Sequence, residues 1–307
     1  MRKVTNKGSS TLAVKPKTEW TPYLLILPVV LLIACVMLYP LCRTFYLAFQ
    51  HFNPAMPFAN GFAGLDNFIT LFTSEEFYSA LFVSLKWVVA LVLLQLVFGM
   101  IVALILNQKF KGRGFFRALV FVPWAMSGVL TAVLFSLIYN QNYGVLNDLL
   151  MKIGLINEPV AWLGNPGLVL GSVIVAELWR GIPFFAISLL AAMQGLPQDV
   201  YEAAKVDGAT KWQTFRMVTL PLLKDTIVLT TLLRTIWEFN SVDLIFSLTN
   251  GGPVGLTTTL SVLIANQALT TNNYGYGSAI SVVSFVILAV IAVVYMKVSG
   301  FAKEGEA

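Results

Sequence analysis

The chain has 307 residues, of which 57% are hydrophobic and 11% are charged, and its mean hydropathy is +0.78. This composition excludes an ordinary water-soluble domain, which could not cover so much apolar surface with polar groups. The net charge of +5 does not indicate a nucleic-acid-binding protein, because the basic residues lie at the ends of apolar runs and form no single stripe.

Apolar runs of about 20 residues recur along the chain, and each is long enough to cross about 30 Å of hydrocarbon as a helix. We therefore predict an all-α polytopic membrane protein with one membrane domain over 21–299, between cytoplasmic tails over 1–20 and 300–307. The predicted spans are 21–42, 87–108, 118–139, 168–193, 222–248 and 278–296. A lipid-attachment site at Cys35 is not expected, because the apolar run continues to Cys42.

Lysine and arginine residues predict the orientation of these spans, because cytoplasmic loops carry an excess of them. One set of loops and tails contains Arg2, Lys3, Lys7, Lys15, Lys17, Lys109, Lys111, Arg113, Arg117, Lys205, Lys211, Arg216, Lys224, Lys297 and Lys303. The opposite set contains Arg43, Lys86 and Lys152. Both termini and the loops over 109–117 and 194–221 are therefore expected on the cytoplasmic side.

The outer segment before the second span has a capping-box pattern at Thr73 and Glu76, which predicts a helix leading into that span. Further along the chain, Asn250-Gly251-Gly252-Pro253 is interpreted as an outer turn and not as a phosphate loop.

The 194–221 loop has strong helix signals and is predicted to form two short helices. Pro197 suits a first helical position, Asp199 favours the positive end of the helix dipole, and Gly208 can take the left-handed conformation that ends a helix near 207. Thr210 and Gln213 form a capping-box pattern that starts a second helix.

One face of the first of these helices carries Val200, Ala203, Ala204 and Asp207. A helix of about ten residues is not stable alone in water. Two interpretations follow from the pattern. The helix either sits in a groove of another protein, where the small alanines allow close approach, or lies on the membrane surface.

A spaced motif in this loop consists of Glu202-Ala203-Ala204, three residues, Gly208, nine residues, Val218, one residue and Leu220-Pro221. It resembles the E-A-A-x3-G-x9-I-x-L-P signature of permease subunits of binding-protein-dependent ABC importers, with Val218 in place of the usual isoleucine. The resemblance implies that the first helix is the coupling helix, which sits in a cleft of a separate ATPase. The implied ATPase-coupling residues are Tyr201, Glu202, Ala203, Ala204, Asp207, Gly208, Leu220 and Pro221.

Other segments are similar to carbohydrate permeases of the maltose and glycerol-3-phosphate type. They are Gly64–Phe68, Phe116–Pro123, Tyr201–Gly208 and Phe239–Leu244 continuing to Gly251-Gly252-Pro253. The resemblance implies the six-helix type I ABC importer permease fold in a bacterial or archaeal inner membrane. It also implies a second homologous permease, an ATPase dimer, an extracytoplasmic solute-binding protein and a sugar as substrate.

The sequence lacks the motifs of an enzyme. It has no Gly-x-x-x-x-Gly-Lys-Ser/Thr loop, so ATP and Mg²⁺ are expected on the partner ATPase and no cofactor on this chain. His51 is the single histidine, and Cys35 and Cys42 lack metal-ligand spacing, so neither catalysis nor a metal site nor a disulfide is predicted.

Charged side chains within the spans should face the bundle interior or a wet path, because lipid exposure is costly. Glu177 with Arg180 and Arg234 with Glu238 have the spacing of ion pairs on one helix. The alternative is that some of these groups bind sugar hydroxyls. The candidate substrate-path residues are Trp124, Trp179, Arg180, Trp237, Glu238, Asn240 and Asp243. For the tryptophans, anchoring at the membrane interface remains an alternative.

Three other functions remain open on the sequence alone. An ABC permease could carry an anion or a polyamine in place of a sugar. An ion-coupled secondary transporter would use a buried carboxylate such as Glu238 or Asp243 as its coupling site. A membrane-embedded enzyme is disfavoured, because histidines, cysteines and paired carboxylates do not cluster at catalytic spacing.

Overall fold

The computed structural model describes residues 21–300, and the predicted tails over 1–20 and 301–307 lie outside them. The chain divides into two compact units, Met1–Arg43 and Thr44–Ala307, which are described separately. In the first unit an apolar helix covers the run that was predicted as the first span. Its segments are α1 (Thr21–Ile33), a π-helical turn η1 (Ala34–Leu38) and α2 (Tyr39–Leu47), which continues into the second unit.

The second unit starts with a small cap. Strand β1 (Gln50–His51) pairs antiparallel with β2 (Gly61–Phe62), and a 3-10 turn, η2 (Pro57–Ala59), lies between them. In α3 (Asp66–Thr73), the buried Asn67 amide donates hydrogen bonds to the carbonyl groups of Ala48 and Gln50, at 3.0 and 2.9 Å. This amide ties the start of the unit to the cap.

The helix cap predicted at Thr73 is wrong by one residue. Ser74 is the N-cap of α4 and accepts a hydrogen bond from the backbone of Phe77, whereas the Thr73 hydroxyl donates back into α3. Because the capped helix starts at Glu75, α4 runs over Glu75–Asn107 and begins well before the predicted span of 87–108.

The centre of the second unit is the packing of α4 against α8 (Val169–Gln194). Gly99 on α4 allows close contact, because a Cβ there would meet Phe185 and the backbone of Ala186. Trp87 and Leu189 are fully buried in the same core. The range predicted as the fourth span, 168–193, coincides with α8.

Two ranges predicted as continuous spans are broken, and these predictions are corrected. The range 118–139 covers the second part of α5 (Arg113–Ala125) and all of α6 (Gly128–Ile138), and these two helices are bent by 96° relative to each other. Ser127 starts the second of these helices by capping it, with its hydroxyl 3.2 Å from the Leu130 nitrogen. The range 222–248 contains α12 (Lys224–Phe239) and α13 (Asp243–Leu248).

The remaining helices complete the second unit. They are α7 (Val145–Lys152), α9 (Gln198–Val206), α10 (Lys211–Thr214), the π-helical η3 (Phe215–Thr219), α11 (Leu220–Leu222), α14 (Leu260–Leu269) and α15 (Tyr274–Ser299). The sixth predicted span, 278–296, lies within α15. In the predicted turn, Asn250 and Gly251 have positive φ angles of 48° and 84°.

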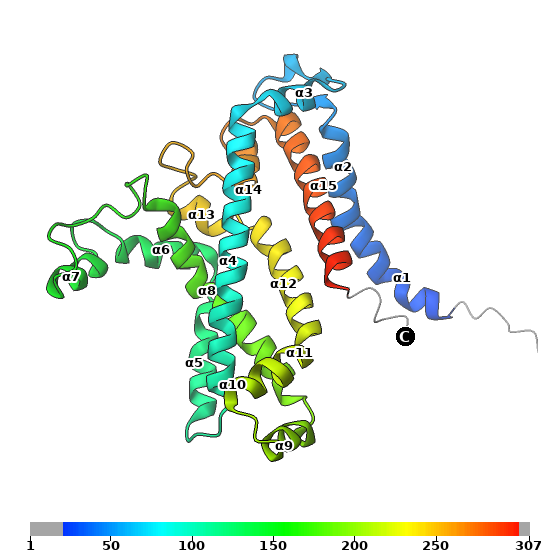
Figure 1. Ribbon diagram of the computed structural model, residues 1–307. Helices are drawn as coiled ribbons and strands as arrows, with labels where there is room; N and C mark the ends of the chain where they lie inside the picture. The colour runs from blue at the N-terminus through cyan, green and yellow to red at the C-terminus, as the bar shows by residue number, and fades with distance from the viewer. Residues whose placement is uncertain (1–20, 301–307) are drawn as a thin grey trace, which may run out of the picture. The chain divides into compact units, whose positions relative to one another are not determined.

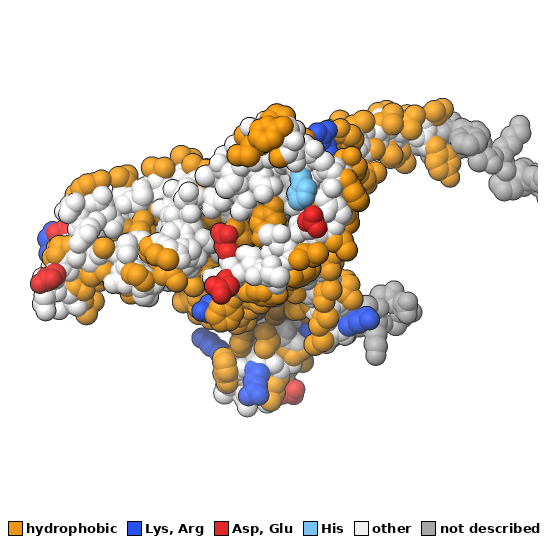
Figure 2. All heavy atoms as spheres, turned by 90° about the horizontal axis from the view of Figure 1, so that it is seen from above, with side chains coloured by type: hydrophobic (Ala, Val, Ile, Leu, Met, Phe, Trp, Pro, Cys, Tyr) orange, Lys and Arg blue, Asp and Glu red, His pale blue; other side chains and the backbone are white. Residues whose placement is uncertain are grey.

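Within residues 21–300, four helices are long and apolar enough to cross a membrane, or five if the bent pair α5–α6 counts as one span. Figure 1 shows α9, α10 and the start of α5 at one end of the second unit, with α3 and the start of α15 at the other end. Figure 2 looks onto the α3 end, where hydrophobic side chains cover much of the surface and charged ones are few. The chain is mostly helical, as predicted.

Candidate functional sites: the 194–221 loop and a buried charge cluster

Helix α9 has the terminal signals that its sequence predicts, with one shift. Pro197 is extended, with ψ 131°, and lies directly before the first helical residue instead of being that residue. Asp199 lies in the first turn, where a carboxylate favours the positive end of the helix dipole. Gly208 has a φ of +74°, a left-handed conformation that favours glycine and ends the helix.

The second helix of the loop begins with a complete capping box. The Thr210 hydroxyl accepts from the Gln213 backbone, and the Gln213 side chain accepts from the Thr210 backbone at 2.8 Å. After one α-helical turn the chain becomes π-helical over η3 and reaches α12 through α11. Short, ordered segments therefore join α9 to α12.

Most of α9 is exposed, and none of its residues is buried within this chain. The Tyr201 hydroxyl lies 3.2 Å from the Thr219 hydroxyl, which fixes the inner side of α9 to η3. Glu202, Ala203 and Asp207 are exposed, and Ala204 is half-buried. The face predicted for partner contact is therefore accessible.

The remaining predicted coupling residues, Leu220 and Pro221, are exposed at the start of α11. The exposed surface of the loop is also apolar: Val206 is 87% exposed, and the nearby Trp212 and Met217 are exposed as well. A short helix with small and apolar exposed side chains can fit a groove on another protein.

A cluster of charged side chains lies inside the second unit between α4, α8 and α12. One Arg234 amino group lies 3.0 Å from Glu177 on α8 and 2.6 Å from Glu238, which is one turn along α12. Gln95 on α4 accepts a hydrogen bond from Arg234 at 2.6 Å and donates one to Glu238 at 3.1 Å. All four residues are at most 5% exposed, so each charge depends on its partners.

The cluster continues toward the break between α12 and α13. Arg180 contacts both oxygens of Glu177, at 2.8 and 3.0 Å, and lies 3.8 Å from Asp243 at the start of α13. Asp243 also accepts a hydrogen bond of 3.0 Å from the backbone of Gly128 at the start of α6. The side chains of Arg180 and Asp243 are 20% and 41% exposed, so this edge of the cluster is accessible.

Both ion pairs predicted within single helices are confirmed, but the bonds between helices were not predicted. Gln95 is the residue that sequence reasoning missed, although a lone amide within a long apolar run of α4 was an available signal. Glu238, predicted as a substrate-path residue, is 2% exposed and held by Arg234 and Gln95. In this conformation it is not accessible to a substrate.

The aromatic candidates for the path lie apart from one another. Trp124 packs on Phe121, Trp179 on Phe135 and Trp237 on Phe184, with ring centroids 5.1, 5.7 and 5.1 Å apart. Trp124 and Trp237 are more than 40% exposed, and Trp179 is half-buried. Asn240 is exposed, and its side chain donates to the carbonyl of Ile236 at 2.8 Å. The structure therefore brings Arg180, Glu238 and Asp243 together in the charge cluster, but it does not bring all seven predicted residues together.

Metal ligands were not expected from the sequence. In residues 21–300 no group of three or more histidine, cysteine, aspartate or glutamate side chains could hold a metal ion.

Residues 95–299, which include the 194–221 loop and the whole charge cluster, match the model of the family described as "Binding-protein-dependent transport system inner membrane component". The chain belongs to this family. This membership confirms the prediction of a multi-pass permease of an ABC transporter, a class whose ATPase is a separate subunit. The permease is therefore not an enzyme.

Similar proteins cover nearly the whole permease. It is 38% identical to the trehalose/maltose transport system permease protein MalF of Thermococcus litoralis, over 92% of this chain and 94% of that protein. It is 32% identical to the multiple sugar-binding transport system permease protein MsmF of Streptococcus mutans, over 91% and 94%.

The fold is also similar to a solved ABC importer. The crystal structure of a bacterial alginate ABC transporter in complex with an alginate pentasaccharide-bound periplasmic protein matches with a TM-score of 0.79 and 26% identity, covering 91% of the permease and 94% of that chain. This match confirms the predicted type I importer fold, although the count of six spans is not established by it.

Proposed function

We propose that the permease is the pore-forming subunit of an ATP-driven importer that translocates a sugar, either an oligosaccharide or a sugar derivative. Relatives named for trehalose and maltose, for multiple sugars and for lactose support a sugar, as does the alginate importer of similar fold. The aromatic and polar side chains of Trp124, Trp179, Trp237, Arg180 and Asn240 are of the kinds that bind sugar rings and hydroxyls.

The proposed assembly has three further components. A second homologous permease completes the path, an ATPase dimer binds ATP and Mg²⁺, and an extracytoplasmic binding protein delivers the sugar. In this arrangement both termini and the 194–221 loop are cytoplasmic, as the distribution of lysine and arginine indicates.

The observation that carries this proposal is the exposed helix α9 with its fixed ends. We expect its accessible Ala203 face to enter an ATPase cleft, and the contact of Tyr201 attaches α9 to η3, which leads into α12. On the other side α8 ends at Gln194, only a few residues before α9 begins. Closure of the ATPase dimer around α9 would thus move α8 and α12 and switch the path between inward and outward access.

A substitution at Gly208 tests this role. Gly208→Val forces a branched side chain into a left-handed backbone and displaces the end of α9, while no spatial neighbour lies within 4 Å of the new Cβ position. The matched control is Gly154→Val, at a glycine with a φ of +73° and equally open space after α7. Both variants should reach the membrane, because neither change lies in the core.

The measurement uses the complete transporter in proteoliposomes with the loaded binding protein and internal ATP. Gly208→Val should abolish sugar uptake and remove stimulation of the ATPase, whereas Gly154→Val should retain both. Normal uptake by Gly208→Val contradicts the coupling role. Uptake that persists without ATP under an imposed ion gradient would instead identify an ion-coupled transporter.

A further inference from the structure

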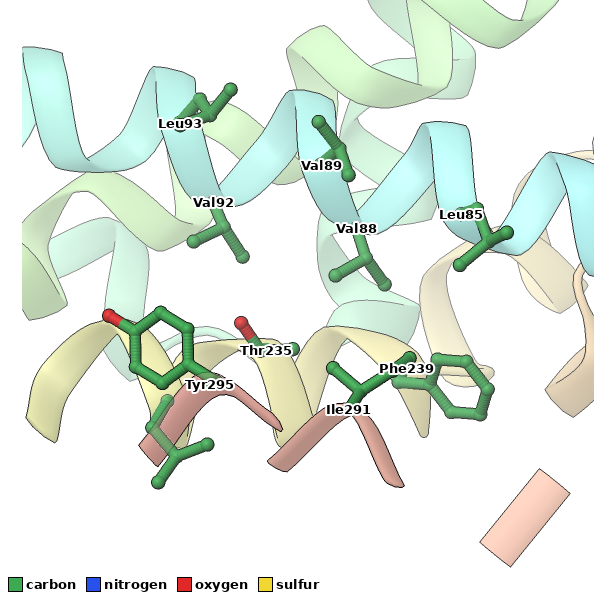
Figure 3. Close-up of a pocket in the computed structure, with 10 residues that line it drawn as sticks. Leu85, Val88, Val89, Val92, Leu93, Thr235, Phe239, Ile291 and Tyr295 are labelled. Atoms are coloured by element: carbon green, nitrogen blue, oxygen red, sulfur yellow. The ribbon is translucent and has the colours of Figure 1, made fainter. Parts of the chain in front are cut away.

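One face of α4 lines two successive hollows in the second unit. The first lies between α4, α12 and α15, and Figure 3 shows Val88 and Val92 of α4 facing Thr235 of α12 and Ile291 of α15 across it. The α4 residues that line the two hollows follow each other at helical spacing: Leu85, Val88, Val89, Val92 and Leu93, then Leu96, Val97, Met100, Ile101, Leu104 and Gln108. The two hollows therefore continue along one stripe of the helix.

The second hollow has a volume of about 800 Å³, and residues of the 194–221 loop form part of its lining. Apolar side chains from Leu96 to Leu104 line its α4 wall, and Phe215, Leu220 and Ile227 line the opposite side. From Leu96 to Gln108 the helix rises about 18 Å at 1.5 Å per residue, close to half of a hydrocarbon core of about 30 Å. The hollow thus has the length of one membrane leaflet.

Basic side chains gather at the end of this hollow that is nearest to α10 and to the end of α4. Lys211 lines it directly, beside the exposed Trp212 and the polar Gln108. The residues directly after Gln108 surround a smaller hollow of about 410 Å³, which is lined by Lys109, Phe110, Lys111 and Arg113. Within residues 21–300 no carboxylate pairs with any of these four cations.

We propose that the second hollow is a binding site for an anionic phospholipid of the adjacent leaflet. Its acyl chains lie against Leu96–Leu104 of α4, and its phosphate lies between Lys211 and the basic segment 109–113. Charge favours a lipid of this kind, because clustered lysines and arginines at a membrane surface attract anionic headgroups. The exposed indole of Trp212 suits the same interfacial depth. The first hollow has no cation on its lining and carries no such proposal.

The proposed lipid site includes residues of the segment that connects α9 with α12. Lys211, Trp212 and Phe215 belong to α10 and η3, the segment that connects α9 with α12. A bound lipid would therefore contact the elements that change position when α9 moves. This inference uses the cytoplasmic placement of the loop but does not depend on which solute is carried.

Lipid counting on the intact transporter tests the site. The full-length permease with its co-purifying subunits is placed in nanodiscs of equal parts phosphatidylglycerol and phosphatidylcholine, released in detergent and examined by native mass spectrometry. Lys211→Gln should weaken phosphatidylglycerol binding about fivefold, and Lys109→Gln with Lys111→Gln by more, since each surface cation contributes about 1 kcal/mol. The control is Lys86→Gln, which removes a cation near the opposite end of α4.

A second pair of variants separates filling of the hollow from loss of charge. Ile101→Trp fills the hollow and should displace the lipid, whereas Ile105→Trp, at a similarly exposed position of α4 that lines neither hollow, should not. The proposal is overturned if all variants retain as much phosphatidylglycerol as the wild type. It is also overturned if the wild type retains phosphatidylcholine as well as it retains phosphatidylglycerol. Crosslinks from Ile101→Cys to another subunit would show that protein occupies the hollow and would also overturn it.

Discussion

Asp243, at the start of α13, accepts a hydrogen bond from the backbone of Gly128, at the start of α6. This contact joins the two places where long apolar ranges of the sequence break into separate helices. Gly128 is buried, and a Cβ at its position would overlap the Asp243 carboxylate. The contact requires glycine at 128 and a hydrogen-bond acceptor at 243. It holds the break between α5 and α6 next to the break between α12 and α13.

Gly128→Ala should therefore destabilise the permease. The added methyl group displaces the Asp243 carboxylate, and such overpacking costs about 1 to 3 kcal/mol. The loss should appear as a lower midpoint of thermal unfolding of the purified protein in detergent. Gly171→Ala, where the added Cβ meets nothing within 4 Å, should leave the midpoint unchanged or raise it. If Gly128→Ala is as stable as the wild type, the contact does not constrain the fold.

Arg234→Met should have a larger effect on stability. It leaves Glu177 and Glu238 buried without the cation that both contact, and breaking a buried ion pair in this way costs about 3 to 5 kcal/mol. Lys152→Met breaks an exposed pair with Asp148 and should change stability by at most about 1 kcal/mol. Chemical unfolding in detergent compares the two variants, and equal stabilities would contradict the role assigned to Arg234.

Asn147→Ala should loosen one outer segment without unfolding the helices. The Asn147 side chain is 2% exposed and bonds to Gln141, to both backbone groups of Val160 and to the indole of Trp162. Loss of these bonds should cost about 2 kcal/mol locally, or roughly 30-fold faster hydrogen exchange over residues 141–162.

Hydrogen exchange followed by mass spectrometry measures this change. The control is Asn142→Ala, which alters an exposed asparagine in the same segment. Unchanged exchange over 141–162 would mean that other contacts hold the segment, and accelerated exchange throughout α4 and α8 would mean that the whole fold had loosened.

A cysteine at Ala203 should crosslink to the ATPase subunit. Ala203 is exposed on the face of α9 proposed to enter the ATPase cleft, so a short bifunctional reagent should join the two chains with a yield that changes when ATP binds. The natural cysteines, Cys35 and Cys42, are free and exposed and must first be replaced by serine.

The matched position for this experiment is Tyr143→Cys, at an exposed residue before α7, which should not reach the ATPase. Crosslinks from Ala203 that reach only lipid, or subunits on the outer side, would remove the basis of the coupling role.

Local signals explain what could be predicted from the sequence. Apolar length predicted α4, α8 and α15, because a helix that satisfies its own backbone in lipid needs no distant partner. Gly208 and the Thr210–Gln213 capping box predicted the ends of the helices at α9 and α10, since these signals act within one turn.

Long-range contacts explain what was missed. The break at Ser127 depends on a cap that is visible in the sequence, but also on Asp243, which lies far along the chain. The charge cluster needed Gln95 from a third helix, and one amide in an apolar run does not reveal which arginine it will contact. The buried position of Glu238 followed from that same packing.

The charge cluster joins the two helices, α8 and α12, to which α9 is connected along the chain. From α9 the chain runs back into α8 and forward through η3 into α12, and Glu177 of α8 and Arg234 of α12 are bonded across the gap. Helix α9 is therefore connected to two helices, α8 and α12, which an ion pair also joins to each other. In the proposed mechanism a movement of α9 would therefore shift α8 and α12 together, because the ion pair between Glu177 and Arg234 joins the two helices.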